Sequence, residues 1–308
     1  ISCLVTWILL YFGSYKSLEK TLLVMVLFFS FMTMIIAIAM QSTDYQVSAM
    51  QVSSGLSFSF PSGYLPLALA VFGFTGISYG EIMAYTYWCL EKGYAENSGN
   101  NVEETKHWIK TMQTDVWVTV FFITLGTLPF FFLGAGVLYN VPELQQALAT
   151  SSFWDIDVIS SLQNMFSLVL GGWAKWLFII LAFFVLFSTL LSGTAAFTRT
   201  ISDYLISMGL VKEQANTRKK LIKLIAFLIP FLSGLFYFVL PNPFTLLLIA
   251  GIWAAMGLPI VNIGALYLVN RLEPELQPRI STKFILWASL VLQLSMAVLI
   301  IDDILLAF

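Results

Sequence analysis

The sequence predicts an all-α, polytopic membrane protein. Its composition, the length of its apolar segments and the distribution of its basic residues support this fold class. Hydrophobic residues make up 59% of the 308 residues and charged residues only 10%, whereas a soluble domain is about 25% charged. So few charges cannot cover the surface of a soluble protein of this size. The apolar residues instead form runs near the length, about 20 residues, that a helix needs to cross a bilayer.

Eight apolar segments are predicted to cross the membrane as helices and to form a single transmembrane domain over 1–308. Helices are expected because a lipid-exposed backbone must satisfy its hydrogen bonds internally, and the alternation of a β-barrel strand is absent. The segments are 1–12 (incomplete), 20–41, 64–92, 116–139, 174–198, 221–240, 244–269 and 283–306.

Basic residues fall almost entirely on one side of the predicted membrane. With eight alternating crossings, one side carries 14 of the 15 basic residues and the other side carries only Lys175. Loops rich in Lys and Arg remain in the cytoplasm. We therefore expect a multi-pass protein of the cell (inner) membrane with cytoplasmic basic loops and an external C-terminus. The cytoplasmic connections are 13–19, 93–115, 199–220 and 270–282.

One predicted segment, 64–92, departs from the plain apolar pattern. Gly73, Gly76 and Gly80 lie near its midpoint, and Glu81 follows directly. Glycine is about 1 kcal/mol less favourable than Ala within a helix, so three glycines in eight residues indicate local unwinding. The same spacing also suits the close approach of another helix, and this alternative remains open.

Glu81 is the only acidic or basic residue placed well inside a predicted segment. An ionisable group there costs at least about 2.5–3.5 kcal/mol on insertion scales, so it usually faces a polar cavity and marks an ion pathway. A structural carboxylate held by hydrogen bonds is the alternative. Unwound backbone beside a carboxylate is an arrangement with which secondary transporters bind their substrates near the midplane.

Further polar side chains occur in the later segments. Ser188 and Ser192 are four residues apart and therefore share a helix face, and Asn262 follows a Gly-Leu-Pro break in segment 244–269. With Gly76 they are candidates for an ion path. Hydroxyls that bond to their own helix or to a neighbouring helix are the alternative explanation for the serines.

Motifs for catalysis and for nucleic-acid binding are missing from the sequence. It contains no Gly-rich phosphate loop, no nucleophile elbow and no His pair at metal-ligand spacing. The basic run at 218–223 fits the topology rule better than nucleic acid. We therefore expect a protein that moves a small solute or ion across the lipid bilayer, not an enzyme, with no cofactor and no nucleic-acid partner.

Several strings resemble Nramp-type (natural resistance-associated macrophage protein) divalent metal transporters. The turn at 15–19 resembles a short basic turn between that family's fourth and fifth helices, and 87–94 resembles divergent bacterial members. Residues 192–196 with 202–205 are similar to its eighth helix, and 257–259 match a Gly-Leu-Pro in its tenth. The resemblance implies an inverted-repeat, broken-helix (LeuT-like) fold, with the family's first three helices missing from this chain. It also implies symport of protons with a divalent cation such as manganese or iron.

Two motifs depart from the family's pattern. The Asp-Pro-Gly-Asn string of its first broken helix is absent, and the stretch 79–85 has neither the Pro nor the His of the second. We hypothesise a metal site formed by the Glu81 carboxylate with the carbonyls of Tyr79 and Gly80, and with Met83 and Tyr85 as secondary candidates. A carboxylate suits hard cations such as Mg²⁺ or Mn²⁺, and a thioether favours softer ones. An amino-acid or other small-solute carrier of the same fold is the alternative function.

Overall fold

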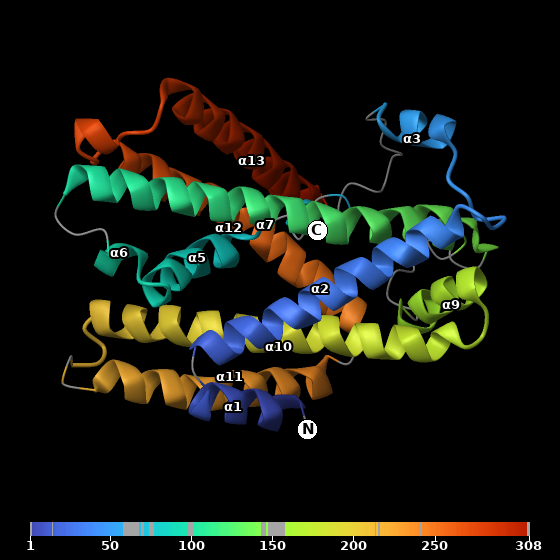
Figure 1. Cartoon of the computed structure of the whole chain (residues 1–308), viewed down its shortest axis with the longest axis horizontal. Coiled ribbons are helices and arrows are strands. Elements are labelled where there is room, and N and C mark those ends of the chain that lie inside the picture. Colours follow the sequence, from blue (N-terminus) through green and yellow to red (C-terminus); the bar gives the residue numbers. More distant parts are fainter. Residues whose placement is uncertain are drawn as a thin grey trace. The chain divides into compact units, whose positions relative to one another are not determined.

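The computed structural model is helical along most of the chain that it describes (Figure 1). The described residues are 2–13, 15–57, 68, 71–73, 77–97, 101–142, 146, 158–212, 214, 216–240 and 242–306. No strand occurs among them, so the all-α class is confirmed. The α-helices are α1 (Ser2–Phe12), α2 (Tyr15–Met40), α3 (Ala49–Gly55), α5 (Tyr79–Glu91), α6 (Tyr94–Asn97), α7 (Val102–Gly136), α9 (Val158–Leu170), α10 (Ala174–Ser207), α11 (Thr217–Val239), α12 (Pro243–Val269) and α13 (Ile280–Leu306).

Six helices in the described part of the chain are long and apolar enough to cross a membrane. These six candidate spans are all or part of α2, α7, α10, α11, α12 and α13. Of the other two predicted crossings, 1–12 is the shorter apolar helix α1, and 64–92 is only partly described and is interrupted before α5. The structure therefore supports a polytopic helical membrane protein with six candidate spans.

Two helices continue beyond the apolar segments that the sequence predicts as membrane spans. The residues predicted as a connection at 93–115 include α6 and the first 14 residues of α7, and α10 continues from the predicted end at 198 to Ser207. Glu103 and Glu104 lie in the first turn of α7, where acidic side chains favour a helix. Hydropathy locates the part of a helix that suits lipid, whereas helix propensity and end charges set where the helix begins.

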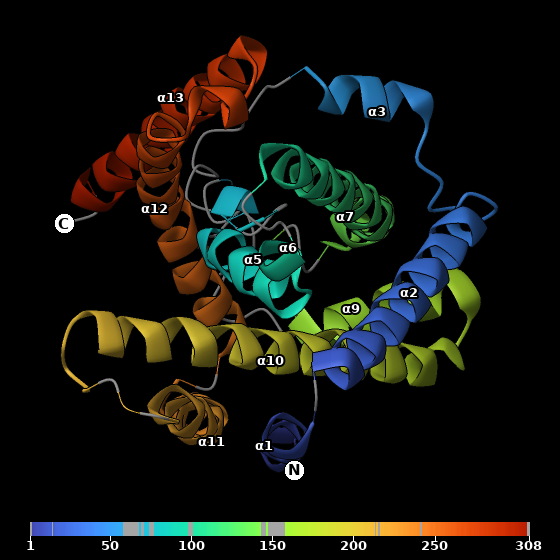
Figure 2. The same ribbon diagram turned by 60° about the vertical axis from the view of Figure 1, so that its left-hand side comes forward.

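The chain groups into two compact units. The first unit contains residues 1–58 and 121–245, and α10 is its central helix, with contacts to α1, α2, α9 and α11. Figure 2 shows α1 and α11 side by side next to α10. The largest core cluster of this unit includes Ile36, Leu133, Phe166 and Leu181, so it joins α2, α7, α9 and α10.

The second unit contains residues 59–120 and 246–308. It holds α5, α6, the first part of α7, α13 and α12 from Leu246. Its backbones approach closely at Gly73, where an added Cβ would lie 1.9 Å from the carbonyl oxygen of Gly251 in α12. Beside this contact, Ala255 is fully buried and packs against Phe72 and Met296. The first glycine of the 64–92 segment therefore allows close helix packing, which is the alternative that its spacing left open.

Substitution of Gly73 by Ala should destabilise the second unit. The added methyl group would collide with backbone, which cannot rotate away, so we expect a loss of about 1–3 kcal/mol, typical of overpacking. Thermal unfolding of the purified full-length protein measures this as a lower apparent melting temperature. Gly264→Ala is the matched control, because it lies in α12 and a Cβ there meets nothing within 4 Å. Equal melting temperatures for Gly73→Ala and Gly264→Ala would contradict the close approach.

Candidate cation site

The 64–92 segment is interrupted immediately before the candidate cation-binding residues. Residues 71–73 are helical, Ile77 and Ser78 are not, and α5 begins at Tyr79. Ser78 has extended backbone angles (φ −76°, ψ 166°), and its carbonyl accepts the first helical hydrogen bond of α5, from the amide of Ile82 at 3.1 Å. The interruption agrees with the unwinding that the glycines predict. Gly76, a candidate for the ion path, lies outside the described residues.

Glu81 is the third residue of α5, and its side chain is exposed. The backbone amide of Ser78 donates a hydrogen bond to Glu81 Oε2 at 2.7 Å. A carboxylate at this position of a capping box satisfies a donor that the helix leaves unpaired. Glu81 therefore has a structural role at the break, and this contact uses only one of its two carboxylate oxygens.

The other candidates on α5 divide between two faces of the helix. Tyr85 follows Glu81 by four residues, and its hydroxyl donates to the carbonyl of Met112 in α7 at 3.2 Å. Tyr79 and Met83 are also four residues apart, and the Tyr79 ring packs so closely on Gly257 of α12 that a Cβ there would lie 2.4 Å from it. At 100° per residue, Glu81 and Met83 point to nearly opposite sides. The structure therefore does not bring the carboxylate and the thioether together.

The positions of Tyr79 and Gly80 in α5 determine whether their backbone carbonyls are free to bind a cation. Both residues lie in the first turn of α5. At this end of a helix the amides are the unpaired groups, whereas the carbonyls accept bonds from the following turn. Their carbonyls therefore belong to the helix rather than to the unwound stretch, which includes Ile77 and Ser78.

The two ion-path candidates on α10, Ser188 and Ser192, bond to their own helix. Ser188 donates to the carbonyl of Val185 at 2.9 Å, and Ser192 donates to that of Thr189 at 3.4 Å. Such bonds correspond to the structural explanation of these hydroxyls. Both serines belong to the first unit, whereas Glu81 belongs to the second.

Asn262, the remaining ion-path candidate, lies in the second unit and is only 7% exposed. Its Nδ2 donates to Gln293 Oε1 of α13 at 3.1 Å and to the carbonyl of Leu286 at 3.4 Å. Its buried Oδ1 has no hydrogen-bond partner among the described residues. The amide thus joins α12 to α13 and leaves one acceptor oxygen in the interior.

An ionic network that the sequence did not indicate fixes the far end of α5 to α7. Lys92 Nζ lies 3.0 Å from Asp115 Oδ2, and the Tyr94 hydroxyl donates to the same oxygen at 2.6 Å. Burial and the hydrogen bond to Asp115 raise the pKa of the Tyr94 hydroxyl. Asp115 closely precedes the apolar part of α7, but sequence alone does not show that Lys92, 23 residues earlier, lies beside it.

The long apolar helices and the interrupted segment together indicate the class of protein. Long apolar helices, one of them interrupted beside a carboxylate, are typical of integral membrane transporters. No group of three or more His, Cys, Asp or Glu side chains that could hold a metal ion occurs within the described ranges.

The comparison with family models identifies the family. The model described as natural resistance-associated macrophage protein-like (Nramp) matches residues 1–302. The chain belongs to this family, whose members transport divalent metal ions and are not enzymes. Neither a curated protein nor a solved structure matches the chain significantly.

Substitution of Asp115 by Ala should loosen the attachment of α5 and α6 to α7. The Asp115 side chain is 30% exposed, so solvent screens its ion pair and we expect a loss of about 1 kcal/mol. Glu273→Ala is the control, because Glu273 is exposed and lies outside α5, α6 and α7. The check is the apparent melting temperature of the full-length protein, and an unchanged value for Asp115→Ala would show that the network stabilises nothing.

Proposed function

We propose that the chain is a proton-coupled secondary transporter that carries a hard divalent cation, Mn²⁺ or Mg²⁺, and that Glu81 binds this cargo. The observation that carries the proposal is the Glu81 carboxylate at the interruption of the 64–92 segment in a member of the Nramp family. The metal is the cargo, so the proposal requires no resident cofactor.

The geometry of Glu81 supports cation binding in two ways. The Ser78 amide holds one carboxylate oxygen at 2.7 Å and so limits the positions of the side chain. The second oxygen, Oε1, is not used by this capping contact and is available as a ligand. A preorganised carboxylate beside non-helical backbone is suited to a cation that must lose part of its water shell.

The separation of Glu81 and Met83 on two faces of α5 favours one class of metal as the cargo. Met83 points away from Glu81, so a site built on Glu81 has oxygen ligands and lacks the thioether. Oxygen ligands favour Mg²⁺ and Mn²⁺ over soft cations. In this proposal Tyr79 positions α5 against α12 and Tyr85 positions it against α7, rather than ligating metal.

The remaining parts of the proposal come from the charge pattern and the family resemblance. The basic side of the chain would face the cytoplasm under the positive-inside rule. Proton symport and a single domain with an inverted-repeat, broken-helix architecture follow from the resemblance to Nramp transporters. The family match over 1–302 does not favour the amino-acid carrier that the sequence left as an alternative.

The test separates the charge of Glu81 from its capping contact. Glutamine also serves at this position of a capping box, so Glu81→Gln should retain the Ser78 hydrogen bond and the melting temperature. We expect Mn²⁺ uptake into proteoliposomes by Glu81→Gln to fall at least tenfold, because the neutral amide is a weaker ligand. Glu81→Ala should lose both uptake and about 1 kcal/mol of stability.

Tyr85→Phe is the positional control, because it lies on the same face of α5 and keeps the ring while removing the hydroxyl that contacts Met112 and Cys89. Its Mn²⁺ affinity should stay near that of the parent protein. Normal Mn²⁺ uptake and affinity in Glu81→Gln would remove Glu81 from the site and leave it a purely structural residue.

A further inference from the structure

The first unit contains an antiparallel helix pair, α1 and α11, whose register three contacts define. Cys3 Sγ lies 3.2 Å from the carbonyl oxygen of Pro230, and the Trp7 and Phe227 rings meet edge to face at 5.6 Å. Lys223 Nζ lies 4.1 Å above the centre of the Tyr11 ring. Successive contact residues along α1 thus pair with successively earlier residues of α11, so the two helices are antiparallel. The end of α1 therefore lies beside the beginning of α11.

Exposed lysines gather at this end of the pair. Lys219, Lys220 and Lys223 are exposed and lie within about 100° of one another around α11. Lys16 and Lys20, also exposed, occupy the first turns of α2, which begins three residues after α1 ends. Three lysines therefore lie at the Tyr11 end of the pair, and two more follow it closely in the chain.

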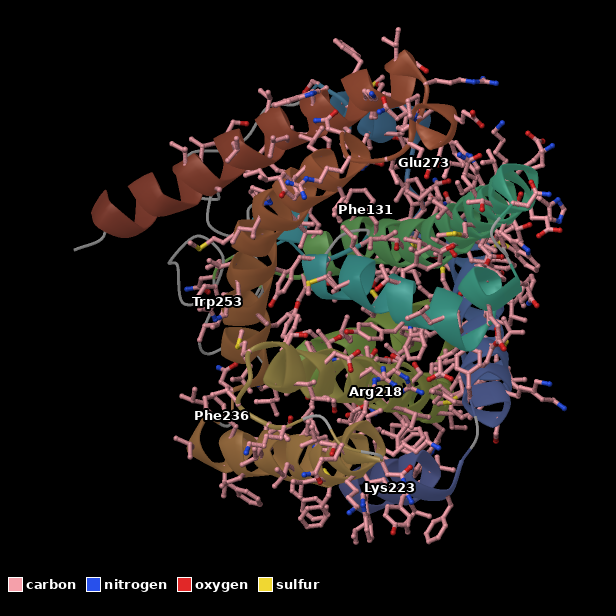
Figure 3. All side chains as sticks on the ribbon, turned by 90° about the vertical axis from the view of Figure 1, so that its left-hand side faces the viewer. Phe131, Arg218, Lys223, Phe236, Trp253 and Glu273 are labelled. Carbon is pink, nitrogen blue, oxygen red and sulfur yellow. The ribbon has the colours of Figure 1, made fainter. Side chains whose placement is uncertain are left out.

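Few acidic residues lie near this cluster in the sequence, and one of them, Glu213, lies outside the described residues. Glu19 is the only acidic residue in the stretches 2–20 and 217–223. Asp203 of α10 is already held by Arg218, whose Nε and Nη2 donate to its two oxygens at 2.6 and 3.2 Å. Figure 3 shows Lys223 beside α1, separate from Arg218. Arg218 is therefore not counted among the available cations.

An exposed aromatic surface borders the lysines. Phe12 is 77% exposed, Phe227 is 40% exposed and Tyr11 is 37% exposed. With Trp7 their rings form a chain of contacts, from Phe12 to Tyr11 at 4.8 Å, from Tyr11 to Trp7 at 5.7 Å and from Trp7 to Phe227 at 5.6 Å. Since α11 is a candidate membrane span, this surface lies where a lysine cluster meets lipid-facing apolar side chains.

We propose that this surface binds an anionic phospholipid such as phosphatidylglycerol. Lys219, Lys220 and Lys223 would receive the headgroup phosphate, and the acyl chains would cover Tyr11, Phe12 and Phe227. A basic cluster next to a membrane span attracts anionic lipid headgroups by about 1 kcal/mol per lysine, and aromatic rings are favoured at the depth of the headgroups. The positive-inside rule accounts for the sign of the charge, but not for a lysine fixed over an aromatic ring that is continuous with an apolar surface.

Native mass spectrometry of the full-length protein, titrated with phosphatidylglycerol or phosphatidylcholine, tests the proposal. Phosphatidylglycerol should bind the parent protein more tightly than phosphatidylcholine, and soluble glycerophosphoglycerol should not displace it. The triple variant Lys219→Gln, Lys220→Gln, Lys223→Gln should bind the anionic lipid roughly 100-fold more weakly, about fivefold per lysine. The double variant Lys219→Gln, Lys220→Gln leaves the Lys223 contact with Tyr11 intact and should lose about 25-fold.

A control variant distinguishes a local site from net charge. The triple variant Lys106→Gln, Lys110→Gln, Lys283→Gln removes the same charge from other parts of the chain and should keep the parent affinity. Equal losses in the two triple variants, or no loss in the α11 variants, would overturn the proposal. Displacement of the lipid by soluble glycerophosphoglycerol would also overturn it, because the ligand would then be a phosphate ester and not a membrane lipid.

Discussion

A chain this apolar must satisfy its backbone hydrogen bonds internally, and an interrupted helix is where that requirement is hardest to meet. The break before α5 leaves amides at a new helix start, and the hydrogen bond from the Ser78 amide to the Glu81 carboxylate satisfies one of them. The charge that makes Glu81 a candidate ligand is thus placed by the backbone that the interruption exposes. A neutral apolar residue at this position would leave the amide unpaired and the break without a fixed charge.

The rest of the second unit holds α5 in place around this contact. Tyr79 packs on Gly257 of α12 at the start of the helix, and the Tyr85 hydroxyl bonds to the backbone of α7. At the far end, Lys92 pairs with Asp115. These contacts lie on several sides of α5, so the position of the Glu81 carboxylate follows from packing along the whole helix. In the first unit, α10 has the corresponding central position, and its serines bond to its own backbone.

The sequence predicted the fold class and most spanning helices, because apolar runs of membrane length have few alternatives. It also predicted the interruption, since three glycines near a midpoint weaken a helix whatever surrounds it. It failed to predict the extension of α7 back to Val102, because hydropathy does not detect a charged helix outside lipid. The Lys92–Asp115 pair, the separation of Glu81 from Met83 and the stacking of Lys223 on Tyr11 depend on contacts between distant segments or on exact helix register. Composition and residue spacing do not determine such contacts or the helix register.

The central claim is that the cargo binds the Glu81 carboxylate with oxygen ligands and without the Met83 thioether. X-ray absorption spectroscopy of Mn²⁺ bound to the full-length protein measures the ligand shell directly. The account predicts a shell of oxygen scatterers that loses intensity or disorders in Glu81→Gln and is unchanged in Met83→Leu. A sulfur scatterer in the parent protein that disappears in Met83→Leu would contradict it, because the thioether face of α5 would then hold the metal.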